Sequence, residues 1–360
     1  MLSLYNATRV NGIVTFKGKL SHNVLLDPMI SNAYLLEDQD TVIIYDPSCG
    51  KEMARRIEGY LSYRRQEGKG WKSALLIPGH SHIDHAGNMQ VIEKADAAET
   101  RIFVHESALK NGKILNDTVT LFESLVTISK GYFSRYKAFY FPASLIMKPL
   151  GLLDRVMPEQ TCKLFGRLAS LVWPKAINSS IAPEALLEKD LQTINLGQIN
   201  VKGWRLGNQI VLPTPGHSSC SVSLLWPEKK ALFVSDATWI GNPVFMFSSI
   251  RDSIATFYKF RELTEAGMVE SLLPAHGLII EGKKQILSHL RFHISRMESM
   301  RDEILSLYNT YKEKDINKLT KIAINESPLL KTIYLTSTPK MVANLMDTVA
   351  ICLREADIIS

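Results

Sequence analysis

Apolar runs alternate with amphipathic stretches along the first third of the chain. Three of the runs, TVIIYD (41–46), SALLIP (73–78) and RIFVH (101–105), are short and rich in β-branched or aliphatic residues, which predicts buried strands. The segments between them, KEMARRIEGYLSYRR (51–65) and GNMQVIEKA (87–95), predict helices. Strands that alternate with helices indicate an α/β fold in which the helices cover the faces of a sheet.

The pattern changes twice along the rest of the chain. From residue 106 to 189 it is helical and amphipathic, and several prolines interrupt it. Short strand-like runs return between residues 199 and 274, and the chain is helical from 283 to its end. We therefore predict a sheet-containing domain made of residues 1–105 and 190–282, a helical insertion over 106–189, and a C-terminal helical appendage over 283–360.

Candidate metal-binding side chains cluster directly after the strand SALLIP. The segment GHSHIDH places His80, His82, Asp84 and His85 at the C-terminal end of that strand, where α/β proteins tend to place their sites. Imidazole and carboxylate groups are ligands of zinc, iron and manganese. A polar loop whose side chains only hydrogen-bond one another is the alternative, but this density of histidines favours a metal site.

Three other predicted strands each lead to a single polar residue. QIVLPTPGHSS leads to His217, ALFVSDA to Asp236 and SLLPAHG to His276. Because each of these residues terminates an apolar run, a sheet would gather them along one edge, beside the cluster that follows SALLIP.

The composition is that of an ordinary globular chain. Of the 360 residues, 46% are hydrophobic and 22% are charged. The start of the chain lacks a signal-peptide pattern and no run of about 18 apolar residues occurs, so we expect no spanning helix and a cytoplasmic location. The four cysteines are scattered without a CxxC pair, which argues against a disulfide framework or a zinc knuckle.

The formal net charge of +6 is concentrated in the predicted insertion. Residues 130–175 carry eight basic and two acidic side chains among bulky apolar ones, and the rest of the chain is balanced. Three interpretations remain open. In the first, the segment is a helical subdomain or dimer contact with a solvated charged face. In the second, it is a lid or groove that holds a hydrophobic acyl chain and an anionic group. In the third, it is a basic amphipathic element that rests on an anionic membrane.

These motifs resemble those of the metallo-β-lactamase-fold hydrolase superfamily. The family's HxHxDH motif is matched by His80, His82, Asp84 and His85. Its later single-ligand motifs are matched, in the family's order, by His217, Asp236 and His276. The resemblance covers roughly residues 10–105 and 190–282, and it implies a four-layer αβ/βα metallo-β-lactamase sandwich, here with a helical insertion and C-terminal helices.

The resemblance also implies two divalent metal ions, with zinc favoured over iron and manganese. In that arrangement one ion is bound by His80, His82 and His217, the other by Asp84, His85 and His276, and Asp236 bridges the two. Paired cations would supply a bridging hydroxide and polarise the oxygen under attack. Asp84 would also be catalytic, as a proton donor or acceptor. Asp46 would orient a ligand histidine from behind, with a turn or capping role as the alternative.

The identities of two residues favour certain branches of the family. His82 stands where flavodiiron oxygen reductases have a glutamate, and Asp236 stands where many true β-lactamases have a cysteine or serine. We therefore expect a hydrolase of a thioester or lactone with a hydrophobic acyl portion, as in the glyoxalase II, lactonase and thioesterase branches. The alternatives are a phosphodiesterase or nuclease of the same fold, a mono-iron enzyme similar to persulfide dioxygenases, and a metal-binding regulator without activity.

The expected partner is a small amphiphilic or acyl substrate. The insertion is a candidate for a homodimer interface or a peripheral membrane contact, whereas nucleic acid is not expected because the positive charge is interleaved with bulky apolar residues. The C-terminal helices resemble the appendage that glyoxalase II places beside its metal cleft. His289 and His293, four residues apart on one helix, have no third ligand nearby and are expected to pack, as is His105.

Overall fold

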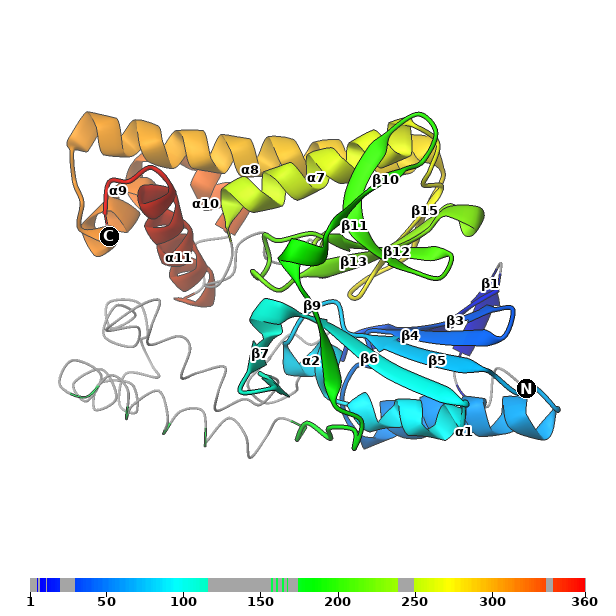
Figure 1. The fold of residues 1–360 in the computed structure, drawn as a ribbon. Helices are drawn as coiled ribbons and strands as arrows, with labels where there is room; N and C mark the ends of the chain where they lie inside the picture. Colours follow the sequence, from blue (N-terminus) through cyan, green and yellow to red (C-terminus); the bar gives the residue numbers. More distant parts are fainter. Residues whose placement is uncertain are drawn as a thin grey trace.

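The computed structural model describes residues 5, 7–10, 12–19, 30–115, 174–238, 249–334 and 339–359, together with four isolated positions between 157 and 167. Most of the predicted insertion lies outside the described residues. The three interpretations of its basic segment therefore stay predictions. Among the residues that are described, two seven-stranded sheets face each other and helices cover their outer sides (Figure 1).

The first sheet joins an antiparallel half to a parallel half. In spatial order its strands are β1 (Ala7–Val10), β2 (Ile13–Phe16), β3 (Ala33–Asp38), β4 (Thr41–Tyr45), β5 (Ser73–Ile77), β6 (Glu99–His105) and β9 (Pro183–Leu186). The pairs β4–β5, β5–β6 and β6–β9 are parallel. The C-terminal ends of the parallel strands therefore meet at one edge of this sheet.

The second sheet is antiparallel except for one pair. In spatial order its strands are β10 (Gln192–Asn195), β11 (Asn200–Leu206), β12 (Gln209–Pro213), β13 (Val222–Trp226), β14 (Ala231–Ser235), β15 (Ser271–Pro274) and β16 (Ile280–Glu281). The parallel pair is β14–β15. Its two strands therefore end side by side, which brings the residues after Ser235 close to those after Pro274.

Both faces of the central strands are buried, and this explains their continuous apolar runs. Along β4, Val42 and Ile44 pack beneath the outer helices, whereas Ile43 and Tyr45 pack between the two sheets. Successive side chains of a strand point to opposite faces, so an apolar run places one half of its residues in each core.

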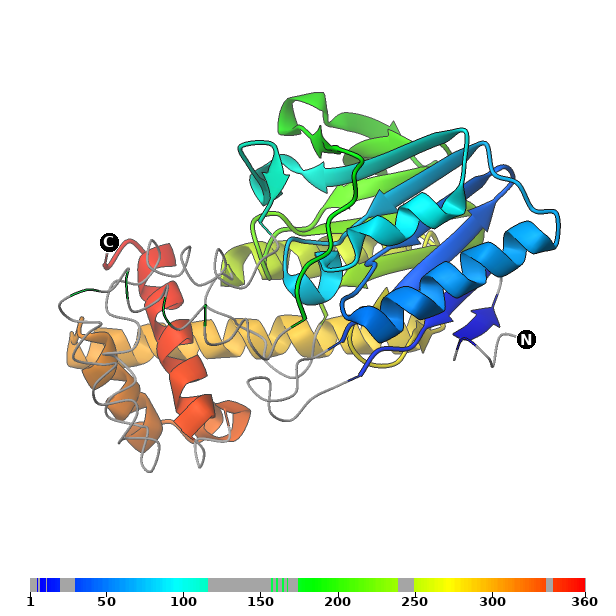
Figure 2. The same cartoon turned by 90° about the horizontal axis from the view of Figure 1, so that it is seen from below.

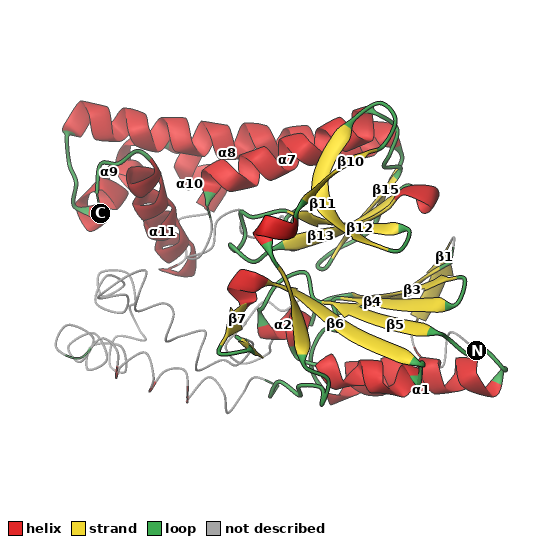
Figure 3. Ribbon diagram, in the orientation of Figure 1, coloured by secondary structure: helices red, strands yellow, loops and turns green. Residues whose placement is uncertain are grey.

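Helices form the two outer layers. The helix α1 (Lys51–Gln66) and the 3-10 helix η2 (Met89–Ala95) cover the first sheet, and α7 (Ile250–Glu265) and α8 (Lys283–Tyr311) cover the second (Figure 3). In α1 the buried residues recur every three or four positions, which gives the helix one apolar face; they are Met53, Ala54, Ile57, Tyr60 and Leu61. This arrangement confirms the predicted four-layer αβ/βα sandwich.

The helix α8 extends well beyond the sandwich. Its far half packs against α9 (Ile316–Glu326), α10 (Pro328–Tyr334) and α11 (Pro339–Glu355), as Figure 2 shows from below. The side chains of α8 that are buried alternate at spacings of four and three; they include Ile286, Leu290, His293, Met297, Met300 and Ile304. One continuous seam therefore joins the sandwich to the C-terminal helices.

The segment GNMQVIEKA was predicted to form a short helix, and its residues Met89–Ala95 form the 3-10 helix η2. The prediction was wrong for part of the range 106–189. This range was predicted to be a helical insertion, but its described residues include short 3-10 helices, a small hairpin and an edge strand of the first sheet; they are η3 (Glu106–Ala108), β7 (Leu109–Lys110), β8 (Lys113–Ile114), β9 and η5 (Glu188–Asp190). Because β9 is an edge strand and buries only Leu186, it carries no apolar run, and the first sheet resumes before the predicted boundary at 190.

Short helical turns complete the described structure. They are α2 (Ile83–Ala86), which follows β5, and η6 (Pro227–Lys229), which joins β13 to β14. Among the described helices, none has the length and apolar character needed to cross a lipid bilayer.

Candidate metal centre

The loop after β5 places the first candidate ligands. It leaves the sheet after Ile77 and enters α2, and His82 is the N-cap residue of that short helix. Asp84 and His85 lie in the single turn of α2, where the amides of the turn favour a carboxylate. The spacing of the HxHxDH motif therefore follows from a loop that tightens into one helical turn at the sheet edge.

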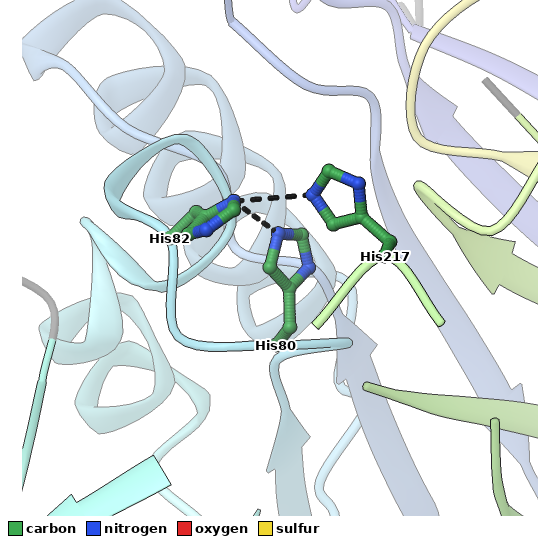
Figure 4. Close-up of side chains that lie close together, drawn as sticks. All are labelled: His80, His82 and His217. Atoms are coloured by element: carbon green, nitrogen blue, oxygen red, sulfur yellow. Dashed lines mark hydrogen bonds between the residues drawn. The ribbon is translucent and has the colours of Figure 1, made fainter. Parts of the chain in front are cut away.

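Three histidines face one another at this edge. His80 Nε2 lies 2.7 Å from His82 Nδ1, which in turn lies 3.2 Å from His217 Nε2 (Figure 4). Two of these residues come from the loop after β5 and the third from the loop after β12. One nitrogen atom from each histidine lies within 4.8 Å of the others, which is a spacing that could hold a metal ion.

A second group of donors lies beside the first. His276 Nε2 is 3.1 Å from Asp84 Oδ2, and His85 Nε2 is 3.6 Å from the same oxygen. One atom from each of these three residues again lies within 4.8 Å of the others. All three side chains are buried.

Asp236 touches both groups. Its carboxylate lies 3.4 Å from His85 Nε2, 3.5 Å from His217 Nε2 and 3.5 Å from His276 Nε2. It also forms a possible metal-binding group with His80 and His85. The structure therefore brings together all seven residues that the sequence singled out as candidate ligands.

The protonation of these side chains suits a cation. Burial, together with the neighbouring His217, lowers the pKa of His82 to about 3. Burial likewise lowers the pKa of His80 and His217. These three imidazoles are neutral at pH 7, so each has a nitrogen lone pair that can bind a metal.

The carboxylates at the site are ionised. Burial opposes their charge, but the imidazoles of His85 and His276 hold the pKa of Asp84 and Asp236 below the ordinary range. Burial also opposes a charge on His85, yet the carboxylates of Asp236, Asp84 and Asp46 raise its pKa well above the ordinary value. The electrostatics therefore favour positive charge among these carboxylates.

Two buried atoms test whether a metal fits. Among the described residues, His85 Nε2 and Asp236 Oδ1 are buried and have no hydrogen-bond partner. An unsatisfied buried polar atom is unfavourable, so native proteins seldom retain one without a reason. A divalent cation bound by these atoms would satisfy both, and imidazole and carboxylate are suitable donors. The residues fit a metal centre.

Asp46 and Ser235 support the histidines from behind. Asp46 accepts a hydrogen bond from the Gly79 amide at 2.6 Å, and its other oxygen lies 3.3 Å from His85 Nδ1. Ser235 Oγ lies 3.3 Å from His80 Nδ1 and 3.1 Å from His85 Nδ1. These contacts hold the two imidazole rings so that their Nε2 atoms face the other donors. The sequence predicted Asp46 for this position but missed Ser235, which no motif marks.

The loop that carries His276 is held from the first sheet. Asn32 Nδ2 donates to the carbonyl oxygens of Pro274 and Gly277, at 3.0 and 3.2 Å, and Tyr34 donates to Pro274 at 2.6 Å. Asn32 and Tyr34 are both buried. Sequence reasoning missed both residues. The only signal was a polar asparagine directly before a strand whose other residues are mostly apolar.

Other histidines lie apart from this centre. His105, at the end of β6, caps η3 by accepting a hydrogen bond from the Ser107 amide, and its ring packs edge-on against Trp204. His289 and His293 contact each other on α8, with ring centroids 4.5 Å apart, and His293 packs against Phe257 of α7. These positions agree with the packing roles expected from the sequence.

Comparison with known families adds to this geometry. A sequence model described as "Metallo-beta-lactamase superfamily" matches residues 26–269. The match covers more than half of the 360 residues and includes the HxHxDH segment, His217 and Asp236, and it ends shortly before His276.

Curated proteins match over a shorter stretch. Acyl-coenzyme A thioesterase MBLAC2 of Homo sapiens and that of Bos taurus are each 31% identical to this chain over 99 residues. The matched stretch is 27% of this chain and 32% of each relative, so the chain aligns with about a third of the length of these relatives. The MBLAC2 protein of Gallus gallus is 34% identical over 68 residues, which cover 18% of this chain and 24% of that protein.

Solved structures share the fold. The sec-alkylsulfatase Pisa1 from Pseudomonas sp. superposes with a TM-score of 0.56 at 15% identity, over 96% of this chain and 49% of that one. A metallo-beta-lactamase family protein from Thermus thermophilus superposes with a TM-score of 0.50 at 15% identity, over 98% of this chain and 96% of that one. At this identity the likeness concerns the fold alone.

Proposed function

Because this chain belongs to the metallo-beta-lactamase superfamily, which includes many metal-dependent hydrolases, we propose that it hydrolyses a thioester or lactone. The proposed substrate is a small amphiphilic molecule with an apolar acyl portion. The observation that carries the proposal is the contact of Asp236 with residues of both donor groups, which joins them into a single centre.

The residues would divide between two divalent ions, most simply zinc. His80, His82 and His217 would hold one ion, Asp84, His85 and His276 the other, and Asp236 would contact both. Bound metal in such a site lowers the pKa of water to near neutrality and polarises the oxygen that is attacked. The chain then needs no serine or cysteine as nucleophile.

Asp84 is the proposed proton carrier. Its carboxylate is ionised and almost fully buried, and Oδ2 lies 3.1 Å from His276 Nε2. A carboxylate within the donor cluster can accept a proton as the tetrahedral intermediate forms and pass it to the leaving group. For a thioester the leaving group is a thiolate, which departs as the free thiol after protonation.

Two lines support a thioester over other substrates. The MBLAC2 proteins, which match part of this chain, are named acyl-coenzyme A thioesterases. Their similarity supports thioester hydrolysis as the proposed reaction. The sequence between residues 130 and 175 also combines apolar bulk with positive charge, as an anionic acyl thioester would require.

A substrate panel tests the proposal. Protein loaded with zinc, manganese or iron is offered acyl-coenzyme A thioesters of increasing chain length, lactones and phosphodiesters, and free thiol or acid release is followed. We expect thiol release that increases with acyl length. Turnover of phosphodiesters alone would favour the phosphodiesterase alternative, and no turnover of any substrate would contradict a hydrolase.

Asp236→Ala is the matching variant. Losing even an outer partner of a metal ligand typically lowers metal affinity or activity by about ten- to a hundredfold, so losing Asp236 itself should reduce turnover by more than about a hundredfold. Asp190→Ala is the control, because Asp190 is exposed on η5 and should leave turnover unchanged. Wild-type turnover in the Asp236 variant would refute its proposed role.

A further inference from the structure

The last residue of α11 contacts the first turn of α7. Glu355 Oε1 accepts a hydrogen bond from Ser249 Oγ at 2.8 Å, and its Oε2 accepts one from the Arg251 amide at 3.2 Å. Ser249 is itself the N-cap of α7 and accepts from the Asp252 amide at 3.0 Å. The first amides of a helix lack partners within the helix, and a carboxylate beside them is stabilising. Glu355 and Ser249 therefore cap α7 together, across 106 positions of sequence.

The same turn of α7 contacts the loop that leads to His217. The Ser249 amide donates to the carbonyl oxygen of Gly216 at 2.7 Å. Gly216 has a φ of +143°, and a Cβ added to it would lie 2.5 Å from Ser253 Oγ, so the loop packs directly on the helix. His217 follows immediately and therefore depends on where this turn lies.

Two further residues of α7 bind the same loop one and two turns later. Thr256 Oγ1 donates to the carbonyl oxygen of Pro215 at 2.8 Å, and Lys259 Nζ donates to that of Pro213 at 2.6 Å. Lys259 is largely buried, and burial lowers its pKa. The loop from β12 to His217 is thus attached to α7 at three carbonyl groups, and Glu355 secures the end of the helix nearest to His217.

We propose that Glu355 is a positioning residue for His217. By fixing the first turn of α7, it holds His217 at the distance from His82 that lets the three histidines bind one metal ion. The inference rests on the proposed metal-dependent function. It assigns the C-terminal helices a role in the metal centre, although the ligands themselves all come from the sandwich.

His217 is the candidate ligand whose position would change most if α7 shifted. His80 and His82 share one loop and move together, whereas His217 comes from the second sheet and completes the trio from the other side. Asp236 and His276 lie at the ends of β14 and β15, which pair with each other within the sheet. A shift of α7 would therefore change the His82–His217 distance and leave the other donor group in place.

Cobalt titration of the full chain tests the inference. Apo protein is titrated with Co²⁺ against a competing chelator, and the visible absorption of the bound ion is followed for wild type, Glu355→Gln, Glu355→Ala and Glu326→Gln. Glu326 is the matched control, because it is an exposed glutamate at the end of α9. We expect about tenfold weaker binding to the three-histidine site in both Glu355 variants, in line with other indirect supports of metal ligands, and unchanged binding in Glu326→Gln.

A second variant separates positioning from general stabilisation. Ser249→Ala removes the other half of the cap, and Ser249→Ala combined with Glu355→Gln should weaken cobalt binding by less than the product of the single effects, because both changes act through one turn. Urea unfolding is measured in parallel for every variant. A lower unfolding midpoint with unchanged cobalt affinity would mean that Glu355 only stabilises the fold, and this would overturn the inference.

The outcomes distinguish the inference from the function on which it rests. If wild-type protein binds no cobalt, the metal centre and the role of Glu355 both fail. If wild type binds cobalt and Glu355→Gln binds it equally well, the role of Glu355 fails and the metal centre stands. Weaker binding in the Glu355 variants alone supports both.

Discussion

Gly79 marks the closest approach of the His80 loop to the second sheet. A Cβ added at this position would lie 2.3 Å from Ser235 Oγ and 2.7 Å from Tyr45 Oη, which is closer than real side chains approach. The Gly79 amide also donates to Asp46. Any side chain here would push His80 away from the hydroxyl that orients it.

Gly79→Ala should therefore affect both stability and metal binding. Overpacking of this kind lowers the free energy of unfolding by about 1–3 kcal/mol, and we expect a weaker affinity for Co²⁺ as well. Gly70→Ala is the matched control, because no heavy atom lies within 4 Å of its added Cβ. Urea unfolding and cobalt titration measure the two effects, and similar results for both variants would contradict the close approach.

Ser235 shows the limit of sequence reasoning about single residues. Its neighbour Asp236 could be predicted, since a carboxylate at a strand end is a recognisable ligand. A serine in the same place is one hydroxyl among many. Its two histidine contacts span 155 and 150 positions of sequence, and only the packing of the two sheets creates them.

The buried face of α8 contains one histidine among apolar residues. His293 occupies one position of the buried seam and stacks on Phe257 of α7. Burial, together with the nearby His289 and Arg296, lowers the pKa of His293 to about 3. In the unfolded chain this imidazole takes up a proton below about pH 6.5, whereas in the folded chain it stays neutral until about pH 3.

This difference makes α8 sensitive to acid. The contribution of His293 to stability is complete above about pH 6.5 and is lost as the pH falls toward 3, because the unfolded state binds the extra proton. At about 1.4 kcal/mol per pH unit, the loss by pH 5 should be about 2 kcal/mol.

His293→Leu should remove this component of the acid sensitivity, since leucine suits the apolar seam and binds no proton. We compare urea unfolding at pH 7 and pH 5 for wild type, His293→Leu and Ser288→Ala, an exposed control on the same helix. From pH 7 to pH 5, the free energy of unfolding should decrease by about 2 kcal/mol less in His293→Leu than in wild type. Ser288→Ala should behave like wild type. An equal decrease in all three proteins would show that His293 does not titrate in this way.

Elements differed in how far the sequence could predict them. Strands β4, β5 and β6 were predicted because their central residues are buried and form apolar runs. The edge strand β9 was missed, since most of its side chains are not buried and it pairs on one side only. An edge strand depends on the neighbour that it joins, and its own sequence carries little of that information.

The two sheets are joined by hydrogen bonds as well as by their shared core. Tyr45 of β4 donates to the carbonyl oxygen of Val222 on β13 at 2.7 Å, and the Val222 amide donates to the carbonyl oxygen of Gly79 at 2.7 Å. Tyr34 makes the corresponding bond to Pro274, next to the loop of His276. These bonds set the distance between the half of the molecule that carries His80 and the half that carries His217 and His276.

Tyr45→Phe should weaken the contact between the sheets. Removing the hydroxyl leaves a buried carbonyl without this donor, so the free energy of unfolding should fall by about 1–2 kcal/mol. Tyr311→Phe, at an exposed tyrosine near the end of α8, should leave it unchanged. The midpoints of urea unfolding compare the two variants, and equal midpoints would contradict a stabilising bond between the sheets.

Local sequence patterns were sufficient to identify the family, the alternation of strands and helices, and the candidate ligands. An apolar run marks a buried strand, and a polar residue at its end marks a possible site, so neither inference needs the rest of the fold. The resemblance of these motifs to those of the metallo-β-lactamase superfamily then implied a four-layer sandwich.

The distances among those ligands and the contacts that support them came from tertiary packing alone. The pairing of His82 with His217, the contact of Asp236 with both groups, and the supporting bonds from Ser235 and Asn32 all join residues from different strands or different sheets. Such contacts depend on sheet order and on the packing of one sheet against the other, which no local pattern encodes. The cap that Glu355 places on α7 has the same origin, since it exists only because the C-terminal helices fold back onto the sandwich.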